Sequence, residues 1–141
     1  MKIVVLSPSG RNISASVRTL PPDAQISVVT SAAVAHDEFE IVRLAPPSAP
    51  LRAVDAWLLR TPVGRAMRRL SPVDPGSVFE RSTRSSSAAA AALVGADLIV
   101  AAERDAVYAA WRWARRTSAQ AVVGFPAARM ASRANRAAEA P

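Results

Sequence analysis

The chain has 141 residues, half of them apolar, and this length predicts one compact domain and excludes a large two-domain enzyme. The absence of cysteine excludes disulfides, thiolate metal sites and thiol catalysis. The formal net charge of +7 favours an anionic partner such as nucleic acid, anionic lipid or a phosphorylated ligand, although GC-rich coding also favours arginine and alanine.

The first third of the chain alternates short apolar runs with breaks. Lys2 to Leu6 is rich in β-branched residues, as a strand buried on both faces is, and Ser7-Pro8-Ser9-Gly10 ends it. The next predicted elements are a short helix over 12–20 and strands over 25–30 and 39–44. Only about eight residues separate these two strands, which is short for a parallel crossover that contains a helix and favours a hairpin.

After a proline-rich linker the apolar pattern becomes helical. It predicts a helical pair over 51–70, with Pro62 at the first position of the second helix. The elements expected beyond a loop at 71–76 are a helix over 77–94, a strand over 97–101, a helix over 105–116, a strand over 121–124 and a C-terminal helix over 126–138. This order predicts a single α/β domain over 1–141, with one open, mostly parallel Rossmann-like sheet of about five strands and helices on both faces.

Parts of this pattern resemble a known family. The stretches concerned are a first strand ending in a Ser/Gly loop, Ile26-Ser27-Val28-Val29-Thr30, Phe39-Glu40-Ile41-Val42-Arg43-Leu44 before a proline-rich break and a helical pair, and Ala96-Asp97-Leu98-Ile99-Val100-Ala101-Ala102. They are similar to the N-terminal domain of glycosyltransferases of the GT-B type. In that family a second Rossmann domain binds most of the nucleotide-sugar donor, and this chain ends after about five predicted strands.

The resemblance implies a glycosyltransferase-like N-domain that is inactive alone and serves as an accessory or degenerate partner in the synthesis of surface polysaccharides or glycoconjugates. Two alternatives stay open: a stand-alone module that binds a nucleotide or phosphorylated ligand, and a non-catalytic interaction protein. The sequence therefore does not decide whether this chain is an enzyme. We expect no cofactor, because neither a G-x-G-x-x-G nor a Walker motif is present.

Open α/β sheets bind ligands at the carboxyl ends of their strands, and this rule defines the candidate pocket. Ser7, Ser9, Gly10 and Arg11 follow the first strand and have the composition of a phosphate cradle, although an ordinary turn with a solvated arginine is the simpler interpretation. Later strand ends add Arg104 and Arg129 to the ligand-binding candidates. Glu103 and Asp105 are candidates for a general base, with helix capping by Asp105 as the simpler interpretation.

Aromatic and basic residues mark two candidate surfaces. The helical pair sets Trp57 beside Arg65, Arg68 and Arg69, the composition of a basic amphipathic surface for an anionic membrane or a partner protein. Trp113, flanked by arginines, is predicted on a partner surface, whereas Tyr108 and Trp111 are predicted in the core. The only histidine, His36, is expected in a loop, and no metal-ligand spacing is present.

The length of the apolar runs and the number of predicted strands indicate where the protein is located and whether it associates with another chain. The apolar runs are too short for a membrane span or a signal peptide, so we expect a cytoplasmic protein, with peripheral contact at the inner face of the membrane as the finer hypothesis. Specific nucleic-acid binding is not expected, because no helix-turn-helix is predicted. A sheet of so few strands leaves an exposed edge, so we expect self-association or a partner chain.

Overall fold

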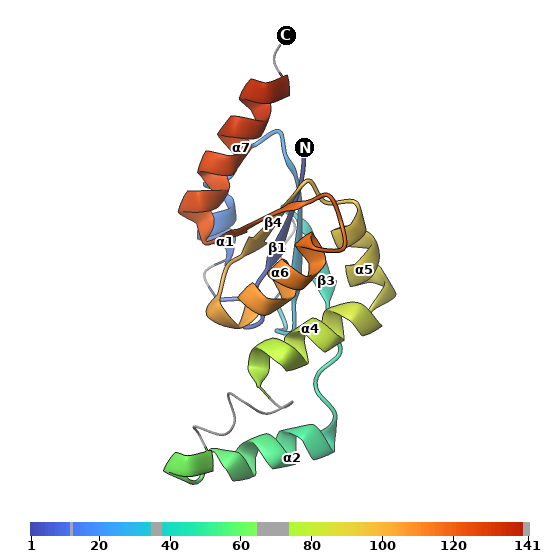
Figure 1. The fold of residues 1–141 in the computed structure, drawn as a ribbon, viewed down its shortest axis with the longest axis vertical. Helices are drawn as coiled ribbons and strands as arrows, with labels where there is room; N and C mark the ends of the chain where they lie inside the picture. Colours follow the sequence, from blue (N-terminus) through green and yellow to red (C-terminus); the bar gives the residue numbers. More distant parts are fainter. Residues whose placement is uncertain (12, 35–37, 65–73, 140–141) are drawn as a thin grey trace.

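A computed structural model describes residues 1–11, 13–34, 38–64 and 74–139 (Figure 1). Its centre is one five-stranded sheet in the order β3-β2-β1-β4-β5, in which every neighbouring pair is parallel. The strands are β1 (Lys2–Leu6), β2 (Gln25–Thr30), β3 (Glu40–Arg43), β4 (Leu98–Ala101) and β5 (Gln120–Val123). The predicted Rossmann-like α/β fold is therefore confirmed.

Strand β1 lies in the middle of the sheet and is buried on both faces. Ile3, Val4, Val5 and Leu6 have no exposed surface, as expected of a continuous apolar run. Their side chains alternate between two apolar clusters, with Val4 and Leu6 in one and Ile3 and Val5 in the other. The chain therefore has two half-cores separated by the sheet.

Helices cover both faces of the sheet, as Figure 1 shows. Helices α1 (Ile13–Val17) and α7 (Phe125–Glu139) pack over Ile3 and Val5. The opposite face is covered by α4 (Pro75–Ser85), α5 (Ser87–Val94) and α6 (Val107–Ala114). A short 3-10 helix, η1 (Arg104–Ala106), connects β4 to α6.

The predicted hairpin between the second and third strands is wrong. β2 and β3 are parallel, with Ser27 opposite Glu40, and the Ser27 hydroxyl donates a hydrogen bond of 2.6 Å to the Glu40 carboxylate. The parallel arrangement places Val42 in the same apolar cluster as Val29 of β2. The connection is shorter than the roughly twelve residues usual for a parallel crossover. The free energy gained by burying this apolar face outweighs the cost of the short connection.

The single helix predicted over 77–94 is also wrong, because two helices occupy this stretch. Ser86 separates them with an extended backbone at φ −90° and ψ 113°. Its hydroxyl accepts a hydrogen bond of 3.3 Å from the amide of Ala89 and so caps α5, while Asp74 caps α4 by accepting from Ser77. The serine-rich middle of the predicted helix is thus a helix end followed by a helix start.

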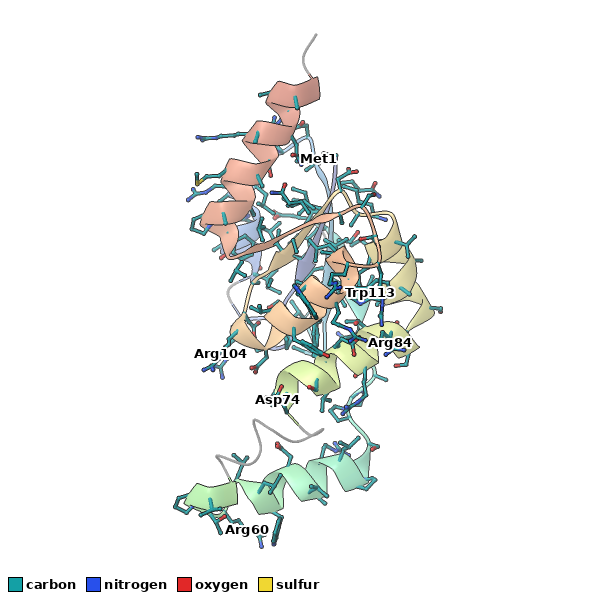
Figure 2. The ribbon with its side chains drawn as sticks, viewed as in Figure 1. Met1, Arg60, Asp74, Arg84, Arg104 and Trp113 are labelled. Atoms are coloured by element: carbon teal, nitrogen blue, oxygen red, sulfur yellow. The ribbon has the colours of Figure 1, made fainter. Side chains whose placement is uncertain are left out.

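The predicted helical pair begins as expected, and most of its second part lies outside the described residues. Helix α2 (Ala49–Leu58) starts after Ser48, and residues 62–64 are helical again. All ten residues of α2 are at least partly exposed, and Figure 2 shows the helix standing away from the sheet. Arg65, Arg68 and Arg69, like the predicted cap Asn12 and the loop residue His36, lie outside the described residues.

Candidate functional site

The loop after β1 makes a tight turn at the carboxyl edge of the sheet. The Gly10 amide donates to the carbonyl of Ser7 over 3.2 Å, and Gly10 has φ +67°. A Cβ at this position would lie 2.5 Å from Cγ2 of Val34 and 3.1 Å from Cβ of Ala32. Glycine is therefore required here both by the backbone conformation and by the close approach of the loop after β2.

Glu103 bridges the ends of the two central strands. Its carboxylate accepts a hydrogen bond from the Ser7 hydroxyl and, over 3.2 Å, from the amide of Ser9. Ser7 is fully buried and Ser9 is exposed, so the carboxylate links the buried end of β1 to the exposed loop that follows it. A phosphate bound by these donors would have to displace Glu103, because they already serve an anion of the chain itself.

The hydrogen bonds of Glu103 do not involve the other predicted site residues. Arg11 is exposed, and its amide donates to the Ser9 hydroxyl over 3.3 Å. Arg104 borders a shallow groove on α6 with Tyr108 and Trp111. Arg129 lies on α7, in a basic groove with Arg133 and Arg136 beside residues 19–22. Asp105 is exposed inside η1, whose N-terminal cap position is occupied by Glu103.

A cavity that the sequence analysis did not identify lies at the carboxyl ends of β1, β2 and β3. Its volume is about 220 Å³, and three segments enclose it: the loops after the strands, α2 and α4. The residues that line it are Pro8, Ser31, Pro47, Leu51, Arg52, Asp55, Pro75, Val78, Phe79 and Ser82. The lining is mostly apolar, and Arg52 and Asp55 contribute one charge of each sign.

The position of this cavity depends on the proline-rich linker. Pro46 and Pro47 carry the chain from β3 to α2 in an extended form, and α2 then lies opposite α4 across the cavity. Phe79 of α4 is 3% exposed and forms the base of the cavity from the core side. Two sequence signals point to this site: the linker, and the rule that places ligands at the carboxyl ends of strands, which includes the loop of Pro8.

The predicted roles of the α6 aromatic residues are reversed in the structure. Trp113 is 6% exposed, and its indole N–H donates to the Thr83 hydroxyl over 2.9 Å, so it does not form a partner surface. Tyr108 and Trp111 are 41% and 49% exposed. The buried face of α6 consists of Ala109 and Ala110 together with Trp113. The two alanines are small and let the helix lie close to the sheet.

Comparison with protein-family models, with curated proteins and with solved structures finds no match to this chain. Within the described residues, no group of three His, Asp or Glu side chains is placed to hold a metal ion. The same part of the chain contains no helix that is both long and apolar enough to cross a bilayer. The fold and the geometry of the carboxyl edge are thus the basis for a functional proposal.

Proposed function

We propose that this chain is a glycosyltransferase-like N-domain that binds an acceptor and works with a partner chain that supplies the nucleotide-sugar donor. The observation that carries the proposal is the cavity between α2 and α4 at the carboxyl edge of a Rossmann-like sheet. This edge is where open α/β sheets bind ligands. The proposed role is accessory, in the synthesis of a polysaccharide or glycoconjugate.

An adjoining groove of about 590 Å³ shares Pro47, Leu51, Val78 and Ser82 with the cavity, and the cavity itself is small. Its volume of about 220 Å³ lies below the roughly 300–1,000 Å³ of sites that enclose drug-sized ligands. A single sugar ring or a short apolar chain is of suitable size, whereas a nucleotide sugar is larger. The apolar lining favours an aliphatic group, and Arg52 and Asp55 offer hydrogen bonds to hydroxyl groups at its rim.

Helix α2 supports a second part of the proposal, peripheral contact with an anionic membrane. Val54 and Trp57 of α2 are 47% and 66% exposed, and Leu59 and Val63, which follow the helix, are 45% and 67% exposed. Exposed apolar side chains next to arginines are typical of surfaces that lie at a lipid interface. Because α2 also forms one wall of the cavity, a lipid-linked acceptor would reach the cavity directly from the membrane surface.

The experiment separates acceptor binding from catalysis. We expect the purified chain to show no turnover with UDP-glucose or GDP-mannose. We also expect it to bind octyl glucoside below the critical micelle concentration. The amide chemical shifts of Ser31, Leu51 and Phe79 measure this binding. Ser31→Trp places an indole ring in the cavity, where it takes space from the ligand. Binding should weaken about tenfold, which corresponds to about 1.4 kcal/mol of binding free energy.

The matched control is Ser118→Trp, which adds the same side chain in the exposed turn between α6 and β5, outside the cavity and its adjoining groove. Binding should be unchanged in this variant. Turnover of a nucleotide sugar by the chain alone would show that the accessory role is wrong. Equal binding by the two tryptophan variants would show that the cavity is not the acceptor site.

A further inference from the structure

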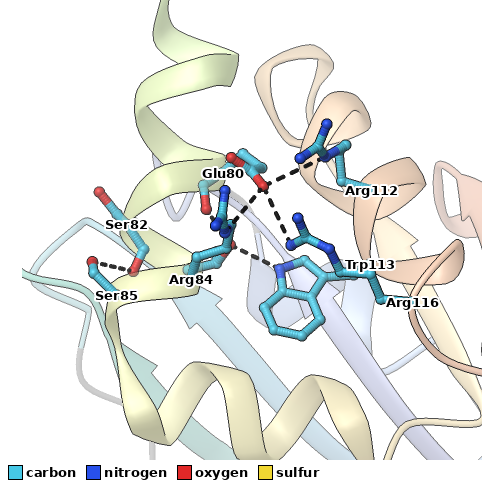
Figure 3. Close-up of polar contacts among 8 residues, drawn as sticks. Glu80, Ser82, Arg84, Ser85, Arg112, Trp113 and Arg116 are labelled. Atoms are coloured by element: carbon cyan, nitrogen blue, oxygen red, sulfur yellow. Dashed lines mark hydrogen bonds and ion pairs between the residues drawn. The ribbon is translucent and has the colours of Figure 1, made fainter.

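Glu80 of α4 is a buried carboxylate surrounded by arginines (Figure 3). It is 4% exposed, and its Oε1 lies 3.9 Å from Nε of Arg84, 3.7 Å from Nε of Arg112 and 3.6 Å from Nη1 of Arg116. No described residue donates a hydrogen bond to this oxygen. We call these three arginines with Glu80 the arginine cluster.

The guanidinium groups of the arginine cluster keep their donors available. All three distances to Oε1 exceed the roughly 3.2 Å of an N–H···O hydrogen bond, so Glu80 attracts these groups without occupying their N–H donors. The side chains of Arg84, Arg112 and Arg116 are 51%, 35% and 37% exposed. Solvent therefore reaches the outer sides of three guanidinium groups that surround the buried Glu80 carboxylate, one from α4 and two from the end of α6.

The charge of the arginine cluster is not balanced. Three guanidinium groups face one carboxylate, which leaves an excess of two positive charges within a few ångströms. Aromatic rings help to hold the arginines in place: the guanidinium of Arg112 lies 5.9 Å from the ring centre of Tyr108, and that of Arg116 lies 5.8 Å from Trp113. A further anion would relieve the mutual repulsion of the three cations.

We infer that the arginine cluster is a binding site for the phosphate monoester group of a phosphorylated ligand. A phosphate monoester near neutral pH carries close to two negative charges, which matches the excess on the cluster. The planar fork of arginine donors suits phosphate oxygens, and Glu80 fixes the forks from behind. This inference is independent of the acceptor cavity, because the two sites share no residue.

The neighbouring surface offers a place for the organic part of such a ligand. The exposed rings of Tyr108 and Trp111 are stacked, with centroids 6.2 Å apart and planes at 25°. They border the shallow groove that Val107 and Arg104 complete. Arg112 connects the two features, because it lies against the Tyr108 ring and also beside Glu80.

The test is a titration of the ¹⁵N-labelled arginine side chains with inorganic phosphate and with glycerol 3-phosphate, at constant ionic strength set by chloride. We expect saturable shifts of the Nε–H signals of Arg84, Arg112 and Arg116. Arg84→Ala and Arg112→Ala should each weaken binding about tenfold, as expected from loss of hydrogen bonds to a charged group. Arg112→Lys keeps the charge but loses the fork, and should weaken binding by an intermediate factor.

The matched control is Arg133→Ala, which removes the same charge from the exposed side of α7. Affinity should change less than about twofold, because surface charges separated by more than about 10 Å are largely screened at 0.1 M salt. An equal loss in Arg133→Ala would show that phosphate is attracted only by the overall charge and would overturn the inference. The absence of saturable shifts would overturn it as well.

Vesicles identify the source of the phosphate group. Vesicles of phosphatidic acid present a monoester, whereas those of phosphatidylglycerol present a diester at the lipid surface. Binding of glycerol 3-phosphate in solution supports a soluble ligand. Preference for phosphatidic acid over phosphatidylglycerol, lost in Arg84→Ala, supports a lipid headgroup. Arg84 is half exposed at the end of α4, so this variant should keep its amide spectrum and thermal unfolding, which serve as checks of folding.

Discussion

Gly10 illustrates how one residue defines the edge where the candidate site lies. The turn after β1 passes so close to the loop after β2 that its α-carbon has no room for a methyl group beside Val34. Thr30 also lies close, with its hydroxyl 3.3 Å from the position of an added Cβ. The contact between these two loops keeps Pro8 and Ser31 on the same side of the cavity.

We expect Gly10→Ala to lower the free energy of unfolding by about 1–3 kcal/mol, because alanine is strained at φ +67° and would also clash. Gly95→Ala is the control, since Gly95 has φ −91° and an added Cβ would meet only Lys2 Nζ at 3.4 Å and a carbonyl at 3.8 Å. That variant should be neutral or slightly stabilising. Urea unfolding measures both, and equal effects would contradict this account of the turn.

The arrangement around Trp113 shows why residue-level predictions on α6 were wrong. The sequence analysis assigned the core face to the larger residues, Tyr108 and Trp111. The buried face instead consists of Ala106, Ala109, Ala110 and Trp113, which have the i, i+3, i+4, i+7 spacing of a helix stripe. Small residues carry a weak hydrophobic signal, although they permit the closest packing on a sheet. The hydroxyl of Thr83, 30 residues away, provides the partner that the buried indole N–H needs.

At the scale of elements, the strands were the most predictable part of the chain. Continuous apolar runs bounded by turn residues specified β1, β2 and β4 to within about one or two residues, the usual uncertainty of element ends. The direction of β3 was not predictable, because it depends on burial against α4 and α5 rather than on the length of its connection. The break at Ser86 was equally hidden, since a serine inside a helix and a serine that caps one look the same in the sequence.

The candidate site was only partly predictable for the same reason. The rule that ligands bind at carboxyl ends of strands identified the correct edge and the first loop. The cavity itself depends on α2, which lies opposite α4 only because Pro46 and Pro47 direct the chain there. The pairing of Ser7 with Glu103 joins residues 96 positions apart and has no local signal.

Helix α2 gives a prediction for lipid binding. We expect co-sedimentation with anionic vesicles and much weaker binding to neutral ones, because each arginine near an anionic surface contributes about 1 kcal/mol. Trp57→Ala should weaken binding roughly tenfold, since burial of a large apolar side chain contributes about 1.5–3 kcal/mol. Met130→Ala removes an exposed apolar side chain, 74% exposed, from α7 and serves as the control. Equal binding to neutral and anionic vesicles would disprove the electrostatic part.

At the scale of the whole molecule, the two sides of the sheet end differently. Both β3 and β5 are outer strands: β3 continues into the linker and the cavity, and β5 has three exposed residues of four. Val123 is 62% exposed. Outer strands with apolar side chains and unpaired backbone groups tend to pair with another chain. This feature supports the hypothesis of self-association or of a partner chain.

We expect sedimentation velocity at micromolar concentration to show a concentration-dependent dimer. Val123→Lys should raise the dissociation constant by on the order of tenfold, because like charges opposite each other across paired strands are unfavourable. Val94→Lys changes an equally exposed valine on α5, 66% exposed, and should leave the dimer unchanged. A monomer at all concentrations would show that the β5 edge does not mediate assembly.

The central position of β1 has a consequence for synthesis on the ribosome. The amide of Lys2 donates a hydrogen bond of 2.6 Å to Asp97, 95 residues later, and β4 completes the sheet beside β1. At about 5–20 residues per second, roughly 5–20 s pass between translation of the two strands. During this interval one edge of β1, a strand whose apolar residues are fully buried in the folded chain, has no partner strand until Leu98–Ala101 emerges.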